Sequence, residues 1–277
     1  MILPIWFKII MSIFLFFLGA SVYSFLNVVI FRVPRGEEFV KTRSHCPGCG
    51  KLLSPIELVP VVSYICLGGK CKDCGSKIGI RDVLIETFGG LSCIASFWIC
   101  FSPMQGIPQS LCEVWVGDFY GRFLAWLAMF AMVGALTVIC FIQIDMGVVK
   151  NGTLIALLVI CVIAVFAMPE VDLSERLIGA LCLSIFVAIG TLISSKKVPF
   201  GLAIATALVG LVIGWMPMLV VALPAAIVAA IVQLAFLAIQ KKKPAGKHFK
   251  LSFALWVGLW VAILFGNMIT TFLYGAF

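Results

Sequence analysis

The sequence predicts an all-α membrane protein with about eight transmembrane helices and one small polar insert. Two features of the composition carry this prediction. Apolar residues make up 63% of the 277-residue chain, whereas soluble domains contain about 45–50%. Charged residues make up only 12%, about half of the usual share. A soluble core could not bury this much apolar surface, so the lipid bilayer is expected to be the main partner of the chain.

Each expected span is a stretch of about 20 apolar residues, the length that crosses the hydrocarbon of a bilayer. The eight stretches lie at 5–31, 83–103, 122–144, 153–168, 177–195, 198–217, 219–239 and 251–275. The first stretch is not expected to be a cleavable signal peptide, because it carries Lys8 early and runs too long. We therefore divide the chain into a first transmembrane helix (1–31), a polar domain (32–82) and a membrane domain of about seven helices (83–277).

The distribution of charge predicts which side of the membrane each loop faces. Seventeen of the 20 Lys and Arg residues fall in the loops 32–82, 145–152, 195–197 and 240–250. Because loops rich in Lys and Arg stay in the cytoplasm, we expect the polar domain to be cytoplasmic and the N-terminus to lie outside. Nucleic-acid binding is not expected, because the basic residues sit beside apolar spans.

The polar domain contains two matched cysteine motifs. Cys46 and Cys49 form one Cys-x-x-Cys-Gly sequence, and Cys71 and Cys74 form the other. Four thiolates in two such pairs are typical of a structural zinc site, and a domain this small usually needs a metal or disulfides. Disulfides are the competing interpretation, although the cytoplasm is normally reducing. The role of Cys112, in an expected outside loop, stays open.

A longer pattern runs from the end of the first span through both cysteine motifs. It consists of the run from Gly19 to Arg35, then Cys46-Pro47-Gly48-Cys49, Val59-Pro60-Val61-Val62-Ser63-Tyr64, Gly68-Gly69-Lys70-Cys71, Arg81 and Leu84-Ile85-Glu86. Over residues 19–90 this pattern resembles the type IV prepilin peptidases. The resemblance implies a bacterial inner-membrane protein that cuts the short basic leader from prepilins and pseudopilins of type IV pili and type II secretion. It also implies a cytoplasmic zinc ribbon and, in bifunctional members, methylation of the new N-terminal amine with S-adenosylmethionine.

The same resemblance implies two catalytic aspartates, and this sequence departs from the family at both positions. Without gaps, Gln143 takes the first position and Asp145 follows it, whereas a two-residue deletion would place Asp145 in the first position. Leu202 takes the second position, and no acidic residue follows Glu175. A pair of carboxylates can supply both the acid and the base of peptide hydrolysis. Proteolysis is therefore expected to be lost or altered.

Several functions stay open. The favoured one is a pseudoenzyme that recognises type IV pilin-like signal segments at the cytoplasmic face of the membrane. The alternative is an active prepilin leader peptidase/N-methyltransferase that uses Asp145 and an unidentified second group. A third hypothesis keeps only the methyltransferase, and an unrelated transporter is disfavoured. Asn27, near the end of the first span, needs a polar partner, either at a joint between the polar domain and the membrane or on the substrate.

Overall fold

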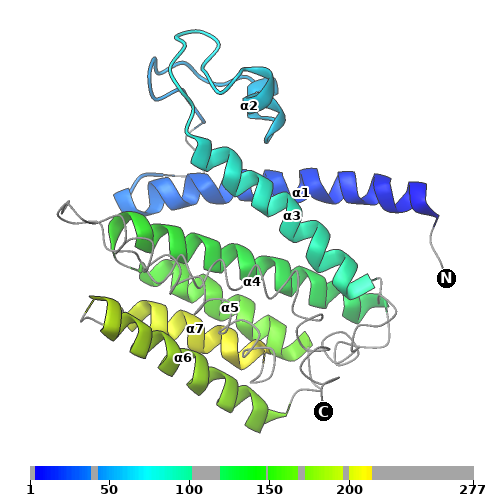
Figure 1. The fold of residues 1–277 in the computed structure, drawn as a ribbon, viewed down its shortest axis with the longest axis vertical. Coiled ribbons are helices and arrows are strands. Elements are labelled where there is room, and N and C mark those ends of the chain that lie inside the picture. Colours follow the sequence, from blue (N-terminus) through cyan, green and yellow to red (C-terminus); the bar gives the residue numbers. More distant parts are fainter. Residues whose placement is uncertain are drawn as a thin grey trace, which may run out of the picture. The chain divides into compact units, whose positions relative to one another are not determined.

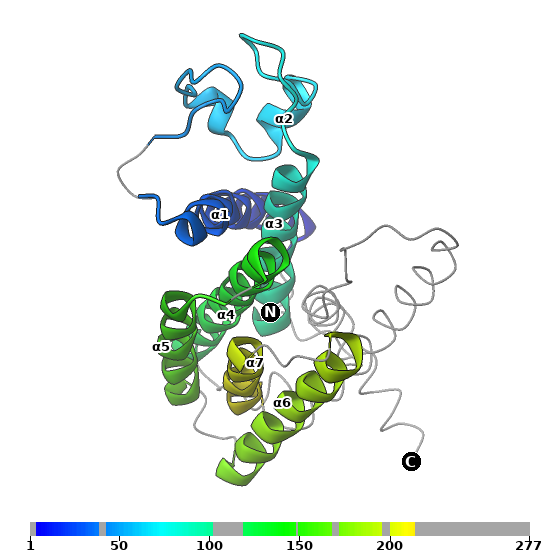
Figure 2. The same ribbon diagram turned by 90° about the vertical axis from the view of Figure 1, so that its left-hand side faces the viewer.

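The computed structural model describes residues 4–38, 43–101, 119–147, 149–167, 172–195 and 200–213. Within these ranges the chain is helical, with two isolated β-bridges and no strand (Figures 1 and 2). The chain divides into two compact units, residues 1–95 and residues 96–277. The spans expected at 219–239 and 251–275 lie outside the described residues. The total of about eight spans therefore remains a prediction.

The first unit consists of two long helices and the polar segment that connects them. Its elements are α1 (Ile5–Arg32), η1 (Val33–Arg35), η2 (Ile56–Leu58), α2 (Val62–Cys66) and α3 (Ile80–Phe101), the last of which continues into the second unit. We call residues 43–79 the cysteine module. Figure 1 shows that this module leads directly into the first turn of α3.

Helices α1 and α3 pack closely because glycines lie where they meet. A Cβ atom on Gly89 of α3 would lie 2.6 Å from Cδ2 of Tyr23, and a Cβ on Gly90 would lie 2.5 Å from Cδ2 of Phe16. On the α1 side, Gly19 faces the backbone of Gly89. Small residues of this kind allow helices to approach closely where no hydrophobic effect drives them together. The Tyr23 side chain is completely buried in the contact.

The described part of the second unit is a bundle of four helices together with the last turns of α3. The four are α4 (Phe119–Met146), α5 (Asn151–Ala167), α6 (Leu173–Ser195) and α7 (Phe200–Ile213). Helix α5 packs against α4, and α7 packs against both α5 and α6. At the contact of α6 with α7, a Cβ on Gly210 would lie 2.6 Å from the carbonyl carbon of Gly179, so a small residue again sets the approach.

Two described helices are long and apolar enough to cross a membrane. These are Ile5–Arg35, which includes η1, and Phe119–Met146; the apolar helices Asn151–Phe166 and Phe200–Val212 are shorter. The helical fold class predicted from the sequence is confirmed for the described residues. Helix α4, for example, was expected at 122–144 and extends a few residues further at both ends.

Candidate functional site

The cysteine module brings together the four cysteines that the sequence singles out. The Sγ atoms of Cys46, Cys49, Cys71 and Cys74 all lie within 4.8 Å of one another. The Sγ atoms of Cys46 and Cys74, one from each motif, are 3.7 Å apart. A tetrahedral ion with metal–sulfur bonds of about 2.3 Å places its sulfurs about 3.8 Å apart. The four thiols are therefore positioned as a metal site requires.

The two cysteine loops are built in the same way. The amide of Gly50 donates to the carbonyl of Cys46 at 2.8 Å, and the amide of Gly75 donates to the carbonyl of Cys71 at 3.0 Å. Both glycines adopt the left-handed backbone conformation, with φ of 72° and 69°. This conformation is costly for residues that carry a Cβ. The glycine after each motif thus closes a tight loop that turns two sulfurs toward the same point.

Ser76 connects the two loops. Its hydroxyl oxygen lies 3.4 Å from Sγ of Cys46 and 3.1 Å from Sγ of Cys74. Hydrogen bonding by this hydroxyl, followed by the backbone amides of Cys49 and Gly48, lowers the pKa of the Cys46 thiol to about 6. The same hydroxyl is the main cause of a lowered pKa at Cys74. The pocket therefore favours thiolates, the form that binds a metal.

Cys49 behaves in the opposite way. The amide of Lys51 favours its thiolate, but burial and the neighbouring sulfurs of Cys74 and Cys46 outweigh that bond and raise the pKa of Cys49 to about 11. Several thiolates this close repel one another, and a divalent cation relieves the repulsion. The donor set and the electrostatics therefore fit a metal ion held by four sulfurs.

A charge pair also links the outer surfaces of the two loops. Nζ of Lys51 lies 2.5 Å from Oδ1 of Asp73. Both side chains are exposed, so the pair contributes little to stability. His45, which precedes the first cysteine, directs Nδ1 toward the carbonyl of Arg43 at 3.3 Å and is exposed. His45 is not part of the sulfur cluster.

Below the cysteine loops, a strained turn is tied to α3. Val61 has φ of 62° and ψ of −48°, and the amide of Val62 donates to the carbonyl of Pro60 at 2.6 Å. These values define a γ-turn of the rare positive-φ form, which is strained for a β-branched residue. The amide of Val61 donates to Oε2 of Glu86 at 2.9 Å. Glu86 therefore stabilises the strained turn from the second turn of α3.

Asn27 has the polar partner that the sequence requires. Its Nδ2 atom donates to Oδ1 of Asp82 at 2.8 Å, which joins α1 to the first turn of α3. Ser24, one turn earlier on α1, lines the same cleft as Glu86. This bond agrees with a structural role for Asn27 at a joint, whereas a role in substrate contact stays a prediction. Asp82 and Glu86 are both engaged in this polar joint.

A cleft of about 270 Å³ lies between the cysteine module and the two helices. The cleft is lined by Ser24 and Asn27 of α1, by Asp82 and Glu86 of α3, and by Tyr64 of α2. Ligand sites generally occupy about 300–1,000 Å³. The cleft as described is therefore slightly smaller than a site for a nucleoside-sized molecule.

The two positions that the sequence predicts to match the family aspartates lie in the second unit. Gln143 is buried in α4 with 8% of its surface exposed, and Leu202 is buried in the first turn of α7 with 1% exposed. A Cβ on Gly201 would lie 2.6 Å from Cβ of Val149, so the start of α7 packs against the α4–α5 connection. The fold therefore brings the start of α7 to the end of α4, but apolar packing occupies the second position.

Asp145, the remaining acidic candidate, lies in the last turn of α4 and is exposed. The helix ends directly after it, because Gly147 adopts φ of 73° and donates its amide to the carbonyl of Gln143 at 2.9 Å. A left-handed glycine of this kind commonly ends a helix. Asp145 is therefore an exposed residue at the C-terminal end of α4.

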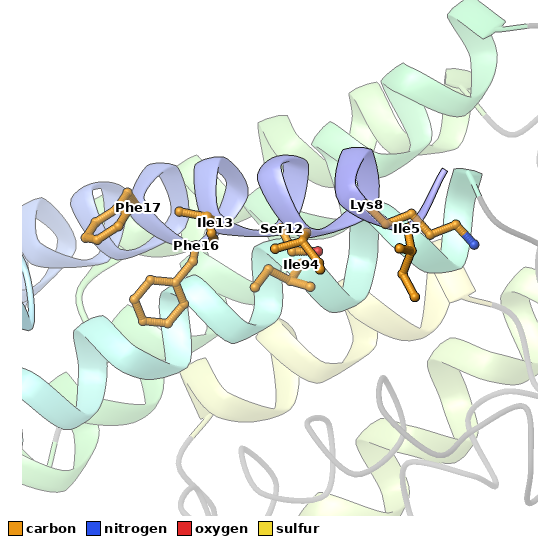
Figure 3. Close-up of a pocket in the computed structure, with 8 residues that line it drawn as sticks. Ile5, Lys8, Ser12, Ile13, Phe16, Phe17 and Ile94 are labelled. Carbon is orange, nitrogen blue, oxygen red and sulfur yellow. The ribbon is translucent and has the colours of Figure 1, made fainter. Parts of the chain in front are cut away.

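A second hollow in the first unit is almost entirely apolar. This groove of about 440 Å³ follows α1 and includes Ile94 from α3 (Figure 3). Figure 3 shows Lys8 extending its amine past Ile5, toward the N-terminal end of α1. A lysine near the end of an apolar helix commonly reaches toward the aqueous boundary in this manner.

Three features of this site were not predicted from the sequence. They are the Ser76 bridge between the sulfur loops, the Lys51–Asp73 pair and the Val61 turn on Glu86. The repeat of the Cys-x-x-Cys-Gly motif could have drawn attention to Ser76, because it follows the second glycine directly. No local sequence pattern predicts a positive φ at a valine.

The chain is similar in sequence to known proteins over the residues that form this site. The family described as "Bacterial Peptidase A24 N-terminal domain" matches residues 17–100. A prepilin leader peptidase/N-methyltransferase of Myxococcus xanthus is 43% identical over 98 residues, which is 34% of this chain and 29% of that protein. The protein of the same name from Pseudomonas aeruginosa is 26% identical over 281 residues, which covers 91% of this chain and 90% of that protein.

A third relative, from Vibrio cholerae and of the same name, is 27% identical over 192 residues, with 64% of this chain and 75% of that protein covered. No solved structure matches the chain. The higher identity of the Myxococcus relative is confined to a stretch of 98 residues. The family model likewise matches the second half of α1, the cysteine module and α3 up to residue 100.

Proposed function

The chain belongs to the prepilin leader peptidase/N-methyltransferase family, and on that premise we propose that it recognises pilin-like signal segments without removing the leader. We also propose that it is a multi-pass protein of the bacterial inner membrane with its cysteine module in the cytoplasm. The apolar helices Ile5–Arg35 and Phe119–Met146 and the predicted placement of the basic loops support this location.

One observation carries the loss of proteolysis. Leu202, at the position of the second family aspartate, is 1% exposed and packed in the first turn of α7. The chain has no acidic residue beyond Glu175, so a carboxylate from α7 is absent in any alignment. A single carboxylate cannot serve as both acid and base around one water in the same step. This absence supports our proposal that the two-aspartate mechanism has been lost.

The cysteine module is proposed to hold one structural zinc ion through Cys46, Cys49, Cys71 and Cys74. The close approach of the four sulfurs supports this assignment. Four protein ligands leave no open position on the ion, as in structural rather than catalytic zinc sites. The ion would contribute folding energy to a segment too small to bury a sufficient core.

A second candidate function is retained methyl transfer. The identity to the Myxococcus relative reaches 43% over 98 residues, and the methyltransferase activity implied by the family does not need the two aspartates. Its donor would be S-adenosylmethionine. The cleft of about 270 Å³ is small for that molecule, so we place no step of methyl transfer in it.

The experiment uses purified full-length protein in lipid nanodiscs with a prepilin-like substrate. The proposal expects the substrate to bind while its leader stays intact. The matched control is the Asp145→Ala variant, which should bind the substrate equally well. Leader removal that disappears in this variant would contradict the proposal and favour an active peptidase built around Asp145.

A further inference from the structure

We propose that the cysteine module carries a membrane-docking surface, the apolar edge, which rests in the interface between lipid headgroups and acyl chains. The apolar edge consists of Ile56, Leu58, Val59, Val62 and Ile65 in η2, α2 and the turn between them. The partner is the lipid surface itself. This inference rests on the membrane location proposed above, but not on any activity toward pilins.

The first support is exposure. Within the cysteine module, Ile56 is 81% exposed and Ile65 is 70% exposed. Leu58, Val62 and Val59 are 45%, 39% and 37% exposed. Five large apolar side chains within ten consecutive residues are unusual on a polar segment. Contiguous exposed apolar surface commonly marks a site of interaction with a protein or a membrane.

The second support is the position of this surface along α3. The amide of Val61, in the middle of the apolar edge, is bonded to Oε2 of Glu86 at 2.9 Å. Glu86 lies in the second turn of α3, roughly 9 Å along the helix from Ile80. Because the expected span of α3 begins at residue 83, this bond fixes the apolar edge at the depth where the span meets water.

The polar joint between the two helices marks the same depth. Asn27 of α1 is bonded to Asp82 of α3 at 2.8 Å. Polar side chains in such a bond tolerate the boundary of the bilayer, where water is available, better than its hydrocarbon core. The strained turn at Val61 therefore holds apolar side chains at the level of this boundary.

The third support is charge. The polar segment 32–82 contains nine basic and five acidic residues. Lys70, Lys72 and Lys77 of the cysteine module are exposed. Basic residues close to the inner membrane surface are attracted to anionic lipid headgroups. The net positive charge of the segment that carries the apolar edge therefore favours its approach to an anionic lipid surface.

The short helix α2 places its exposed apolar residues on one face. Val62, Ile65 and Cys66 follow the i, i+3, i+4 spacing and so share one face of the helix, and all three are exposed. Tyr64 turns toward the cleft instead. The helix therefore separates a face that lines the cleft from a face that is available to lipid.

The test places a photoreactive benzoylphenylalanine at Ile56 or at Ile65 in the full chain. The protein is held in nanodiscs of phosphatidylethanolamine and phosphatidylglycerol, and adducts are identified by mass spectrometry. The matched control is Leu52, an apolar residue that is 52% exposed but lies outside the apolar edge. We expect phospholipid adducts at both edge positions, at a yield several times that at Leu52.

Two results would overturn the proposal. One is an equal lipid yield at all three positions, and the other is crosslinking of the edge positions to the chain's own second unit. A companion variant, Ile56→Ser with Ile65→Ser, should keep its bound metal and become more accessible to protease in nanodiscs. Unchanged protease accessibility would also contradict docking. Failure of the parent protein to enter nanodiscs would instead reject the membrane location.

Discussion

The backbone amide of Val61 donates to the Glu86 carboxylate at 2.9 Å, and the residue that donates it has φ of 62°. This bond links a strained turn of the cysteine module to the second turn of α3. Conformations of this kind persist only where the surrounding structure supports them, and they cluster at functional positions. Glu86 provides that support, and it also lines the cleft beneath the sulfur cluster.

The first prediction is that Glu86→Ala releases this turn. Hydrogen exchange at the Val61 amide should accelerate about tenfold or more, because a lost hydrogen bond to a charged acceptor corresponds to about 1.5–3 kcal/mol. The matched control is Glu57→Ala, since Glu57 accepts the amide of Ser54 at 2.8 Å in the same way. In that variant, hydrogen exchange at the Ser54 amide should accelerate, and exchange at the Val61 amide should stay as in the parent protein. Equal protection of Val61 in all three proteins would refute the role assigned to Glu86.

The second prediction concerns the metal. Protein purified without chelator should contain about one zinc per chain, and Cys46→Ser or Cys74→Ser should lower that content strongly. The matched control is Cys66→Ser, because Cys66 is an exposed cysteine of α2 outside the sulfur cluster. Elemental analysis of the variants checks the prediction. A full metal content in the Cys46 and Cys74 variants would exclude the four-sulfur site.

The third prediction tests the contact of α1 with α3. Gly89→Ala should destabilise the protein by about 1–3 kcal/mol, the usual cost of overpacking, because its Cβ would lie 2.6 Å from the Tyr23 ring. Gly152→Ala in α5 is the control, since a Cβ there meets nothing within 4 Å. Thermal unfolding in detergent should separate the two. Equal unfolding midpoints for Gly89→Ala and Gly152→Ala would show that stability does not depend on a glycine at the contact of α1 with α3.

The fourth prediction tests whether the second aspartate position can accept a carboxylate. Leu202→Asp should reduce the yield of folded protein and lower stability by about 3 kcal/mol or more, because a buried charge would lack a partner. Leu202→Met, which keeps the volume, should cost less than about 1.5 kcal/mol. Size-exclusion profiles and thermal unfolding measure both variants. A stable Leu202→Asp protein would mean that the pocket still tolerates the family's residue.

Much of the fold could be predicted because long apolar runs have only one stable solution in lipid. Helices α1 and α4 match the expected spans closely, since every backbone group of a span must be bonded within its own helix. The close contacts at Gly89 and Gly210 could not be predicted, because which faces of two apolar helices meet depends on packing rather than on periodicity.

The site was predictable in part, because the cysteine motif is repeated. The repeated cysteine spacing places four sulfurs together whatever the surrounding chain does, and the structure brings them within 4.8 Å. The sequence also required a polar partner for Asn27 but could not identify it as Asp82, which is distant in the chain. The positive φ of Val61 depends on a long-range bond to Glu86, so no local residue preference reveals it.

The most direct test of the central claim is the intact mass of a pilin-like substrate. The substrate is co-expressed with this chain in a host that lacks any other prepilin peptidase, and is then recovered from the membrane. We expect the substrate to keep the full mass of its leader and to copurify with the chain. A substrate shortened by its leader, and left uncut when Asp145→Ala replaces the parent, would show that the chain is an active peptidase.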